Sequence, residues 1–239
     1  YDVHENYIKQ LEVKDYLPKI SKNIFRLSLI FMEKIAKKLS DLIIVVHNEL
    51  NPSLTDNKNN IVISNAPVLD YRYRNIRRKN YFIYVGMITK ERNVLKIAKI
   101  LKDLDISLYI AGNCDDAKLK NKITSLKNVN FLGFLKRNEI KKYISESKCG
   151  ICLFDFSQNH LISSPNKLFE YFNYGVPALA SNIPSWVEIK GVNKFTYFVN
   201  PNNDNEIISA VKKINLLNND EINITGQKAN NFINKNYNW

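Results

Sequence analysis

The sequence predicts an α/β protein, with a doubly wound, Rossmann-like parallel sheet in its larger part and a smaller, partial Rossmann-like domain before it. Two observations support this fold class. From Tyr81 onward, short apolar runs alternate with segments of about ten residues that have helical spacing. Glycine also ends several of the apolar runs. This alternation is typical of right-handed βαβ units, whose ligands bind beyond the carboxyl ends of the strands.

The first part of the chain shows a weaker pattern of the same kind. Apolar residues recur near helical spacing over 22–39, and the apolar run 41–47 predicts a buried strand, followed by a short strand over 61–64. The polar, basic stretch that follows carries Pro67 and predicts a linker. The predicted organisation is a partial domain over 1–64, a linker over 65–80 and a second domain over 81–239. The alternative is a complete, compact chain in which 1–64 forms a small appendage.

The second part carries the regular alternation. Gly86, Gly112 and Gly133 each end a predicted strand, so we expect them at the ligand-binding edge of the sheet. The predicted strands are 81–86, 107–112, 129–133, 149–154, 177–181 and 195–199; the predicted helices are 94–104, 117–126, 138–145 and 165–172, with two more at the end of the chain.

Composition favours a folded enzyme. With 239 residues, of which 45% are apolar, the chain can bury one or two ordinary cores. No run approaches the roughly eighteen apolar residues of a membrane span, and no signal peptide is visible at its start. The net charge of +12 is spread over most predicted helices, and without a nucleic-acid-binding motif we expect no nucleic-acid partner. The densest basic cluster lies in the linker and is expected to be solvated: Arg72, Arg74, Arg77, Arg78 and Lys79.

The three cysteines are too few for a disulfide scaffold, which indicates a reducing cytoplasm. Cys149 and Cys152 form a CxxC pattern inside an apolar run that predicts a buried strand. In such a strand the two sulfur atoms point to opposite faces, so we expect no redox chemistry from them.

Residues 163–184, SSPNKLFEYFNYGVPALASNIP, are the most informative stretch. After Pro165, a short helix would carry Asn166, Lys167 and Glu170 on one face, and Gly175 would end it. A helix N-terminus beside a lysine suits a phosphate, and a carboxylate one turn later suits a ribose diol. On spacing alone, a surface salt bridge on an ordinary helix explains the pattern equally well.

This stretch resembles the donor-nucleotide signature of the retaining group 1 glycosyltransferases (GT4), which have the GT-B fold. The family pattern is a Pro-Asn-Lys-Leu-Phe-Glu-Tyr run, then Gly-x-Pro and a strand of small residues. Glu170 matches the glutamate that holds the ribose, and Gly175 and Pro177 have the expected spacing. The resemblance implies a nearly complete C-terminal donor domain. It also implies that 1–64 is the second half of an N-terminal acceptor domain, so that the chain is a fragment lacking the first part of that domain.

The resemblance further implies that the loop VGMITKERNV binds the donor diphosphate. Arg92 matches the second of two family cations, whereas Met87 replaces the first. Lys167, or Lys90 in the same loop, could supply the missing charge. The implied nucleotide-binding residues are Gly86, Arg92, Gly133, Asn166, Lys167 and Glu170.

On the sugar side, Ile162 replaces a glutamate that many family members carry. The resemblance therefore implies either that the sugar is held by main-chain groups near Ser163 and Ser164 or that its hydroxyl pattern is unusual. His160 is either a contact to the sugar or phosphate or an exposed loop residue. His4 matches an N-domain histidine near the donor sugar and the acceptor hydroxyl. The implied catalytic residues are His4, Arg92 and Lys167.

No essential metal or other cofactor is expected. His4, His47 and His160 lack paired zinc-ligand spacing. Asp103 and Asp105 have the spacing of a metal-binding DxD, but they precede a predicted strand and therefore lie at the wrong edge of the sheet for a donor.

The implied activity is transfer of a sugar from a nucleotide-diphosphate donor to a glycan or lipid-linked acceptor, with retention, in surface polysaccharide biosynthesis. We expect a cytoplasmic protein, with peripheral contact at the inner face of the membrane through the lysines of 22–39 as a further option. The alternative is a non-catalytic nucleotide- or sugar-binding module of the same fold. A fragment of this kind need not be active alone.

Overall fold

The computed structural model describes residues 1–3, 6–12, 17–46, 59–63, 69, 73–161 and 163–237, so His4, His47 and Ile162 lie outside the described residues. The chain forms two compact units. The first comprises Tyr1–Asn65 with Gln158–Ser164, and the second comprises Ala66–Ser157 with Pro165–Trp239. The short segment 158–164, which sequence reasoning placed in the second domain, therefore clusters with the first unit.

The first unit contains a parallel three-stranded sheet in the order β1-β2-β3, with Val3, Ile43 and Val45 buried in its core. Its longest helix begins directly after Pro18, whose φ of −58° suits a helix start. This helix starts three residues earlier than expected, and the two short helices of the unit were not predicted. The elements are β1 (Asp2–Val3), α1 (Tyr7–Glu12), α2 (Lys19–Leu39), β2 (Ile43–Val45), β3 (Asn60–Val62) and α7 (Gln158–Leu161).

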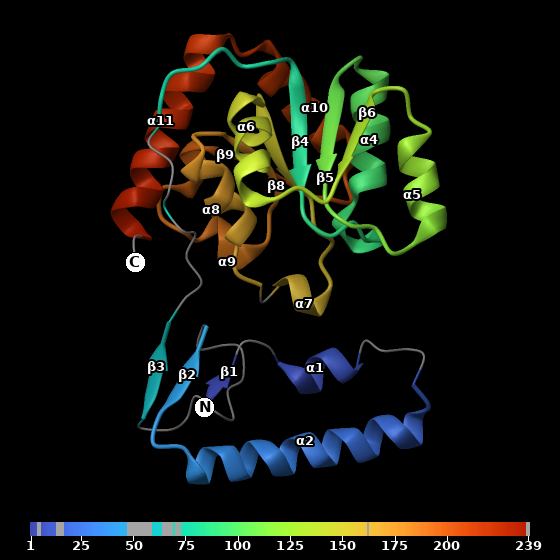
Figure 1. Cartoon of the computed structure of the whole chain (residues 1–239), viewed down its shortest axis with the longest axis vertical. Helices are drawn as coiled ribbons and strands as arrows, with labels where there is room; N and C mark the ends of the chain where they lie inside the picture. The colour runs from blue at the N-terminus through green and yellow to red at the C-terminus, as the bar shows by residue number, and fades with distance from the viewer. Residues whose placement is uncertain are drawn as a thin grey trace. The chain divides into compact units, whose positions relative to one another are not determined.

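The second unit contains a six-stranded parallel sheet in the order β6-β5-β4-β7-β8-β9 (Figure 1). The chain winds outward from β4 through β5 to β6, then crosses over to β7 and winds outward the other way. The doubly wound prediction is therefore confirmed, and the change of direction lies between β4 and β7, where such sheets bind ligands. The strands are β4 (Tyr81–Val85), β5 (Ser107–Ala111), β6 (Val129–Gly133), β7 (Cys149–Cys152), β8 (Ala178–Ser181) and β9 (Thr196–Val199).

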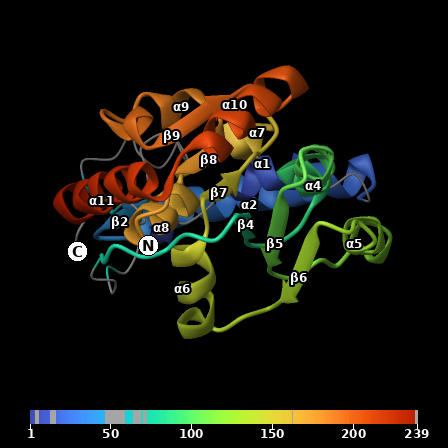
Figure 2. The ribbon, with the colours of Figure 1, turned by 90° about the horizontal axis from the view of Figure 1, so that it is seen from above.

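Helices cover both faces of this sheet: α4, α5 and α10 pack on one face, and α6, α8 and α11 on the other (Figure 2). None of the helices in the described part of the chain combines the length and apolar character that crossing a bilayer requires. The helices of the unit are α4 (Val94–Asp103), α5 (Ala117–Thr124), α6 (Arg137–Glu146), α8 (Asn166–Asn173), α9 (Pro184–Val187), α10 (Asp204–Leu216) and α11 (Asn219–Asn236), with the 3-10 turns η1 (Lys90–Arg92) and η2 (Val192–Lys194).

Successive residues of a strand point to opposite faces of the sheet and therefore belong to two different apolar clusters, as the two-residue period of a strand requires. Phe82 lies in the cluster under α4 and α10, whereas its neighbour Ile83 lies in the cluster under α6 and α8. Cys149 and Cys152 are likewise buried in different clusters. The expectation that their sulfurs face opposite sides of a buried strand is confirmed.

One expectation for the linker is wrong. Arg78 is buried rather than solvated, with 8% of its surface exposed. Its guanidinium donates to the carbonyl oxygens of Ser145 and Gly175 and to Oδ1 of Asn223. A carbonyl oxygen can satisfy a buried guanidinium donor much as water does, which a count of basic residues along the sequence does not reveal. Arg78 thereby ties the segment before β4 to α6, α11 and the end of α8.

Candidate donor site

Three glycines with positive φ lie at the carboxyl ends of neighbouring strands: Gly86 (φ 139°), Gly112 (φ 148°) and Gly133 (φ 67°). Gly86 N donates to Ala111 O at 2.9 Å, and Gly112 N donates to Gly133 O at 2.8 Å. A Cβ on Gly112 would fall 1.8 Å from Gly86 O. Glycine is therefore required here, because the two main chains approach more closely than any side chain allows.

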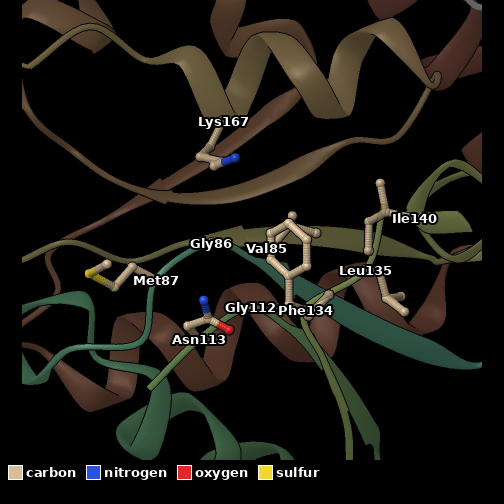
Figure 3. Close-up of a pocket in the computed structure, with 10 residues that line it drawn as sticks. Val85, Gly86, Met87, Gly112, Asn113, Phe134, Leu135, Ile140 and Lys167 are labelled. Carbon is tan, nitrogen blue, oxygen red and sulfur yellow. The ribbon is translucent and has the colours of Figure 1, made fainter. Parts of the chain in front are cut away.

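A cavity of about 270 Å³ lies at this edge of the sheet (Figure 3). Lys167 reaches toward it from α8, and Asn113 lies on the opposite side. Most of the remaining lining is apolar, which suits a flat, weakly polar group such as a nucleobase. The lining residues are Val85, Gly86, Met87, Ala111, Gly112, Asn113, Phe134, Leu135, Ile140 and Lys167. Gly133 is not among them, although it shapes the turn that presents Phe134.

Arg92 is the last residue of the 3-10 turn η1, and its side chain extends toward Gly86. Its Nη1 would lie 3.2 Å from a Cβ on Gly86 and donates to Met87 O at 3.4 Å. The guanidinium also sits 5.0 Å from the centre of the Phe154 ring, a cation–π contact that orients it. Asn93, which replaces the family glycine, has a φ of 51°, a left-handed conformation that asparagine tolerates.

Lys167 approaches the same glycine from α8. Its Cε would lie 3.4 Å from a Cβ on Gly86, and its Nζ lies 2.8 Å from Oε2 of Glu170. Burial raises the pKa of the Cys152 thiol to about 12, while Lys167 and Arg92 lower it and Glu170 raises it further. The three side chains form a compact cluster of two cations and one anion, because Arg92 and Lys167 both lie beside Gly86 and Lys167 is paired with Glu170.

Helix α8 presents its first turn to this cluster. Pro165 precedes the helix without any side-chain cap, so the first N–H groups of α8 are not capped by a side chain. Asn166 is the first residue of α8, and its Oδ1 is buried without a hydrogen-bond partner among the described residues. Gly175, with a φ of 65°, follows the end of the helix as predicted.

Tyr171 is a positioning residue that sequence reasoning missed. Its hydroxyl accepts from Val85 N at 3.2 Å and donates to Ile151 O at 3.1 Å, which joins α8 to the ends of β4 and β7. A Cβ on Gly150 would fall 2.3 Å from the Tyr171 ring. A glycine in the middle of an apolar strand signals such a close approach, so Gly150 was the available clue.

Lys90 does not join this cluster, although it belongs to the same turn as Arg92. It lines a different cavity, of about 520 Å³, together with Lys96 and Asp204 from α4 and α10. Of the two lysines that sequence analysis offered in place of the cation missing at Met87, Lys167 therefore lies beside Gly86 and Lys90 does not. Asp103 lines this second cavity as well, and Asp105 precedes β5, at the opposite edge from Gly112.

The predicted sugar contacts lie in the first unit. Ser163 Oγ donates to the main-chain oxygen of His160 at 2.8 Å, and both residues are partly buried. Ser164 is also partly buried. The roles of His160, Ser163, Ser164 and His4 remain predictions. Among the described residues, no group of three or more His, Cys, Asp or Glu side chains is placed to hold a metal.

Comparison with solved structures shows the fold at low sequence identity. Sucrose-phosphate synthase from Thermosynechococcus elongatus aligns at a TM-score of 0.70 and 14% identity, covering 100% of this chain and 64% of that one. HepE from Anabaena, solved with UDP and glucose, gives 0.68 and 12%, covering 99% and 67%. A TarM mutant of S. aureus, solved with fondaparinux, alpha-GlcNAc-glycerol and UDP, gives 0.68 and 17%, covering 88% and 43%.

The chain thus spans less than half of the length of TarM and about two thirds of the other two proteins. A search of curated proteins gave no match. Residues 72–239 match the sequence family described as glycosyl transferases group 1, and this match covers the whole strand-and-helix alternation from β4 to α11. The chain therefore belongs to the group 1 glycosyltransferases.

Proposed function

We propose that the second unit binds a nucleotide-diphosphate sugar and that the protein transfers this sugar to a glycan or lipid-linked acceptor. The observation that carries the proposal is the convergence of Arg92 and Lys167 on Gly86, beside the cavity at the carboxyl ends of β4, β5 and β6. When the bond from the anomeric carbon to the diphosphate breaks, its electron pair stays on the phosphate oxygen. Fixed cations at that oxygen lower the barrier, each by about 3–4 kcal/mol.

The neighbouring groups suit the rest of a nucleotide. The apolar cavity between Phe134 and Lys167 would take the base, and Glu170 would accept hydrogen bonds from the ribose hydroxyls. Asn166 and the uncapped first turn of α8 would face the phosphates. UDP is bound in the solved HepE and TarM structures, which makes UDP the first nucleotide to test.

Several finer features of the proposal rest on the family resemblance. These are retention of the anomeric configuration, surface-polysaccharide assembly, a cytoplasmic location, and the roles of His4, His160, Ser163 and Ser164 on the sugar side.

We also propose that no metal is essential, because Arg92 and Lys167 supply positive charge where the diphosphate would lie. Activity that survives chelation by EDTA would agree with this; activity restored by added Mg²⁺ would contradict it.

The test of donor binding is thermal stability with UDP, GDP and ADP in turn. A nucleotide at one hundred times its Kd adds about 2.7 kcal/mol of stability, which is a readily measured shift in Tm. We expect the shift to disappear in Arg92→Gln and in Glu170→Ala. Lys90→Gln is the matched control, because Lys90 lies in the same turn but lines the other cavity. Absence of a shift with all three nucleotides would overturn the proposal.

A non-catalytic binding module is the second candidate. Met87 in place of a family cation and Ile162 in place of a family glutamate favour it, because each removes a group that the resemblance assigns to the donor. Release of UDP from a UDP-sugar in the presence of a glycan acceptor separates the two candidates. Binding without turnover, repeated in a longer chain, would favour the module.

A further inference from the structure

Tyr84 is a buried residue of β4 whose hydroxyl group reaches the candidate donor site. Its side chain is 1% exposed and belongs to the apolar cluster under α4 and α10. A Cβ on Gly86 would lie 3.6 Å from the Tyr84 hydroxyl oxygen, 3.2 Å from Nη1 of Arg92 and 3.4 Å from Cε of Lys167. The aromatic ring therefore packs in the core, whereas the hydroxyl lies beside the two cations of the site.

This hydroxyl connects Arg92 to the turn that follows β4. It donates its proton to the main-chain oxygen of Met87 at 2.5 Å, and Nη1 of Arg92 donates to the same oxygen at 3.4 Å. A carbonyl oxygen has two lone pairs, so it can accept both hydrogen bonds. Burial raises the pKa of the Tyr84 hydroxyl to about 12, and a hydrogen bond from Arg92 acts in the opposite direction. That direction agrees with a phenol oxygen that accepts from the guanidinium while its own proton is used on Met87.

The other contacts of the guanidinium do not fix its direction by themselves. The distance of 3.4 Å to Met87 O is long for a hydrogen bond from nitrogen to oxygen. The Phe154 ring, 5.0 Å away, attracts the positive charge but does not select which N–H group points where. The Tyr84 hydroxyl supplies direction in two ways, because it holds the Met87 carbonyl in place and accepts from the guanidinium.

We propose that Tyr84 is a positioning residue that holds the Arg92 guanidinium beside Gly86 before any donor binds. An arginine side chain loses much rotamer freedom when it becomes ordered. If Arg92 is ordered in the free protein, a phosphate does not have to order it, and binding is stronger for that reason. Met87 carries no charge and Lys90 lines the other cavity, so the positive charge of this turn beside Gly86 comes from Arg92.

The order of Arg92 in the free protein does not depend on the proposed function. Only its consequence for a bound diphosphate rests on that function. One measurement is therefore made without nucleotide and a second with it, so that the two proposals can fail separately.

The first measurement is NMR relaxation of the Nε–H group of Arg92 in the free 239-residue chain. Its signal is assigned by its disappearance in Arg92→Gln. In the unchanged chain we expect an order parameter of about 0.85, the value of a rigid group, and in Tyr84→Phe a fall to below about 0.6. Tyr84→Phe removes only the hydroxyl oxygen, so the ring still packs in the core.

Tyr81→Phe is the matched control. Tyr81 lies on the same strand, is 3% exposed, and donates its hydroxyl proton to the main-chain oxygen of Tyr143 at 2.7 Å. Its ring belongs to the cluster on the other face of the sheet. This variant loses the same kind of buried hydrogen bond at a place away from Gly86. We expect a similar loss of thermal stability in both variants but a change in the order of Arg92 in Tyr84→Phe alone.

The second measurement compares the affinities for UDP and uridine. Tyr84→Phe should weaken UDP binding by about three- to tenfold, the effect of one ordinary hydrogen bond. Its affinity for uridine should be unchanged, because uridine has no phosphate for Arg92 to bind. A general distortion of the site would weaken both ligands alike. Tyr81→Phe should bind both like the unchanged chain.

Each result supports or overturns the positioning role. A mobile Arg92 in the unchanged chain would overturn it, as would equal order of Arg92 in Tyr84→Phe and Tyr81→Phe. Equal weakening of UDP and uridine by Tyr84→Phe would overturn it too. If Arg92 loses order in Tyr84→Phe alone and no variant binds a nucleotide, the positioning role is supported and the proposed function is wrong.

Discussion

The ammonium nitrogen of Lys167 lies 2.8 Å from Oε2 of Glu170, so the cation and the carboxylate of the candidate donor site bind each other within one turn of α8. Both side chains remain partly exposed, at 27% and 38%. A pair of this kind adds little to folding, roughly 0–1 kcal/mol. Its effect is to hold the two groups together on α8, with the Lys167 side chain beside Gly86. In the proposed function, the diphosphate would meet Lys167 and the ribose would meet Glu170.

Replacing Lys167 by methionine should therefore separate binding from stability. We expect the free energy of unfolding to change by less than about 1 kcal/mol, because the ion pair is solvent-accessible. Nucleoside diphosphate binding should weaken by about 1.5–3 kcal/mol, the usual contribution of a hydrogen bond to a charged group. Urea denaturation and calorimetric titration with UDP measure the two effects. A large loss of stability with unchanged affinity would show that Lys167 has a structural role only.

Replacing Gly112 by alanine should disturb the close approach of the main chains at Gly86 and Gly112. The new Cβ would fall 1.8 Å from Gly86 O, a main-chain atom that cannot move without shifting the turn after β4. We expect a loss of about 2–5 kcal/mol from strain and overpacking. Gly133→Ala is the control, because its Cβ meets nothing within 4 Å and costs only the strain of its positive φ, roughly 1–2 kcal/mol. Equal losses in urea denaturation of the two variants would contradict the close approach of Gly86 and Gly112.

Replacing Arg78 by methionine should destabilise the second unit. The carbonyl oxygens of Ser145 and Gly175 would lose a buried donor, and an unsatisfied buried acceptor costs about 1–3 kcal/mol. Arg77→Met, at an exposed neighbouring position, should change stability by less than about 0.5 kcal/mol. Thermal and urea unfolding of both variants measure the difference. If the two variants are equally stable, Arg78 is not the structural link that its hydrogen bonds indicate.

Cysteine reactivity should follow burial. Burial raises the pKa of the Cys152 thiol from 9.0 to about 12 and raises the pKa of Cys149 as well. Because the thiolate is the reactive form, we expect a thiol reagent near neutral pH to modify the partly exposed Cys114 and to reach the other two only on unfolding. Rapid labelling of Cys152 in the folded protein, read by mass spectrometry, would contradict this.

The same pKa shift predicts a loss of stability in alkali. Cys152 stays protonated in the folded state, whereas an unfolded thiol ionises above pH 9.0. The contribution of Cys152 to the free energy of unfolding is therefore complete below that pH and is lost as the pH rises toward about 12. Tyr84, whose pKa burial raises from 10.0 to about 12, acts in the same direction. Urea denaturation at increasing pH should show a steeper decline for the unchanged chain than for Cys152→Ala.

The sequence by itself determined the features that depend on local pattern. The two-residue period placed Cys149 and Cys152 on opposite faces of a buried strand, and the position of Gly86 at a strand end placed it at the carboxyl edge of the sheet, where it lines a cavity. The spacing of Lys167 and Glu170 fixed their pairing, because residues three apart on a helix are neighbours. Each of these relations follows from backbone geometry within a few residues.

The tertiary structure alone decided the rest. Arg92 and Lys90 lie two residues apart, yet the guanidinium of Arg92 lies beside Gly86 and over the Phe154 ring, whereas Lys90 lines the second cavity with residues of α4 and α10. Arg78 is buried because its guanidinium donates to the carbonyl oxygens of Ser145 and Gly175, which lie far away in the sequence. Large apolar side chains of α2 are exposed because the described residues of its unit leave them uncovered. In each case the environment of a side chain is made by residues far away in the sequence, and no local pattern records them.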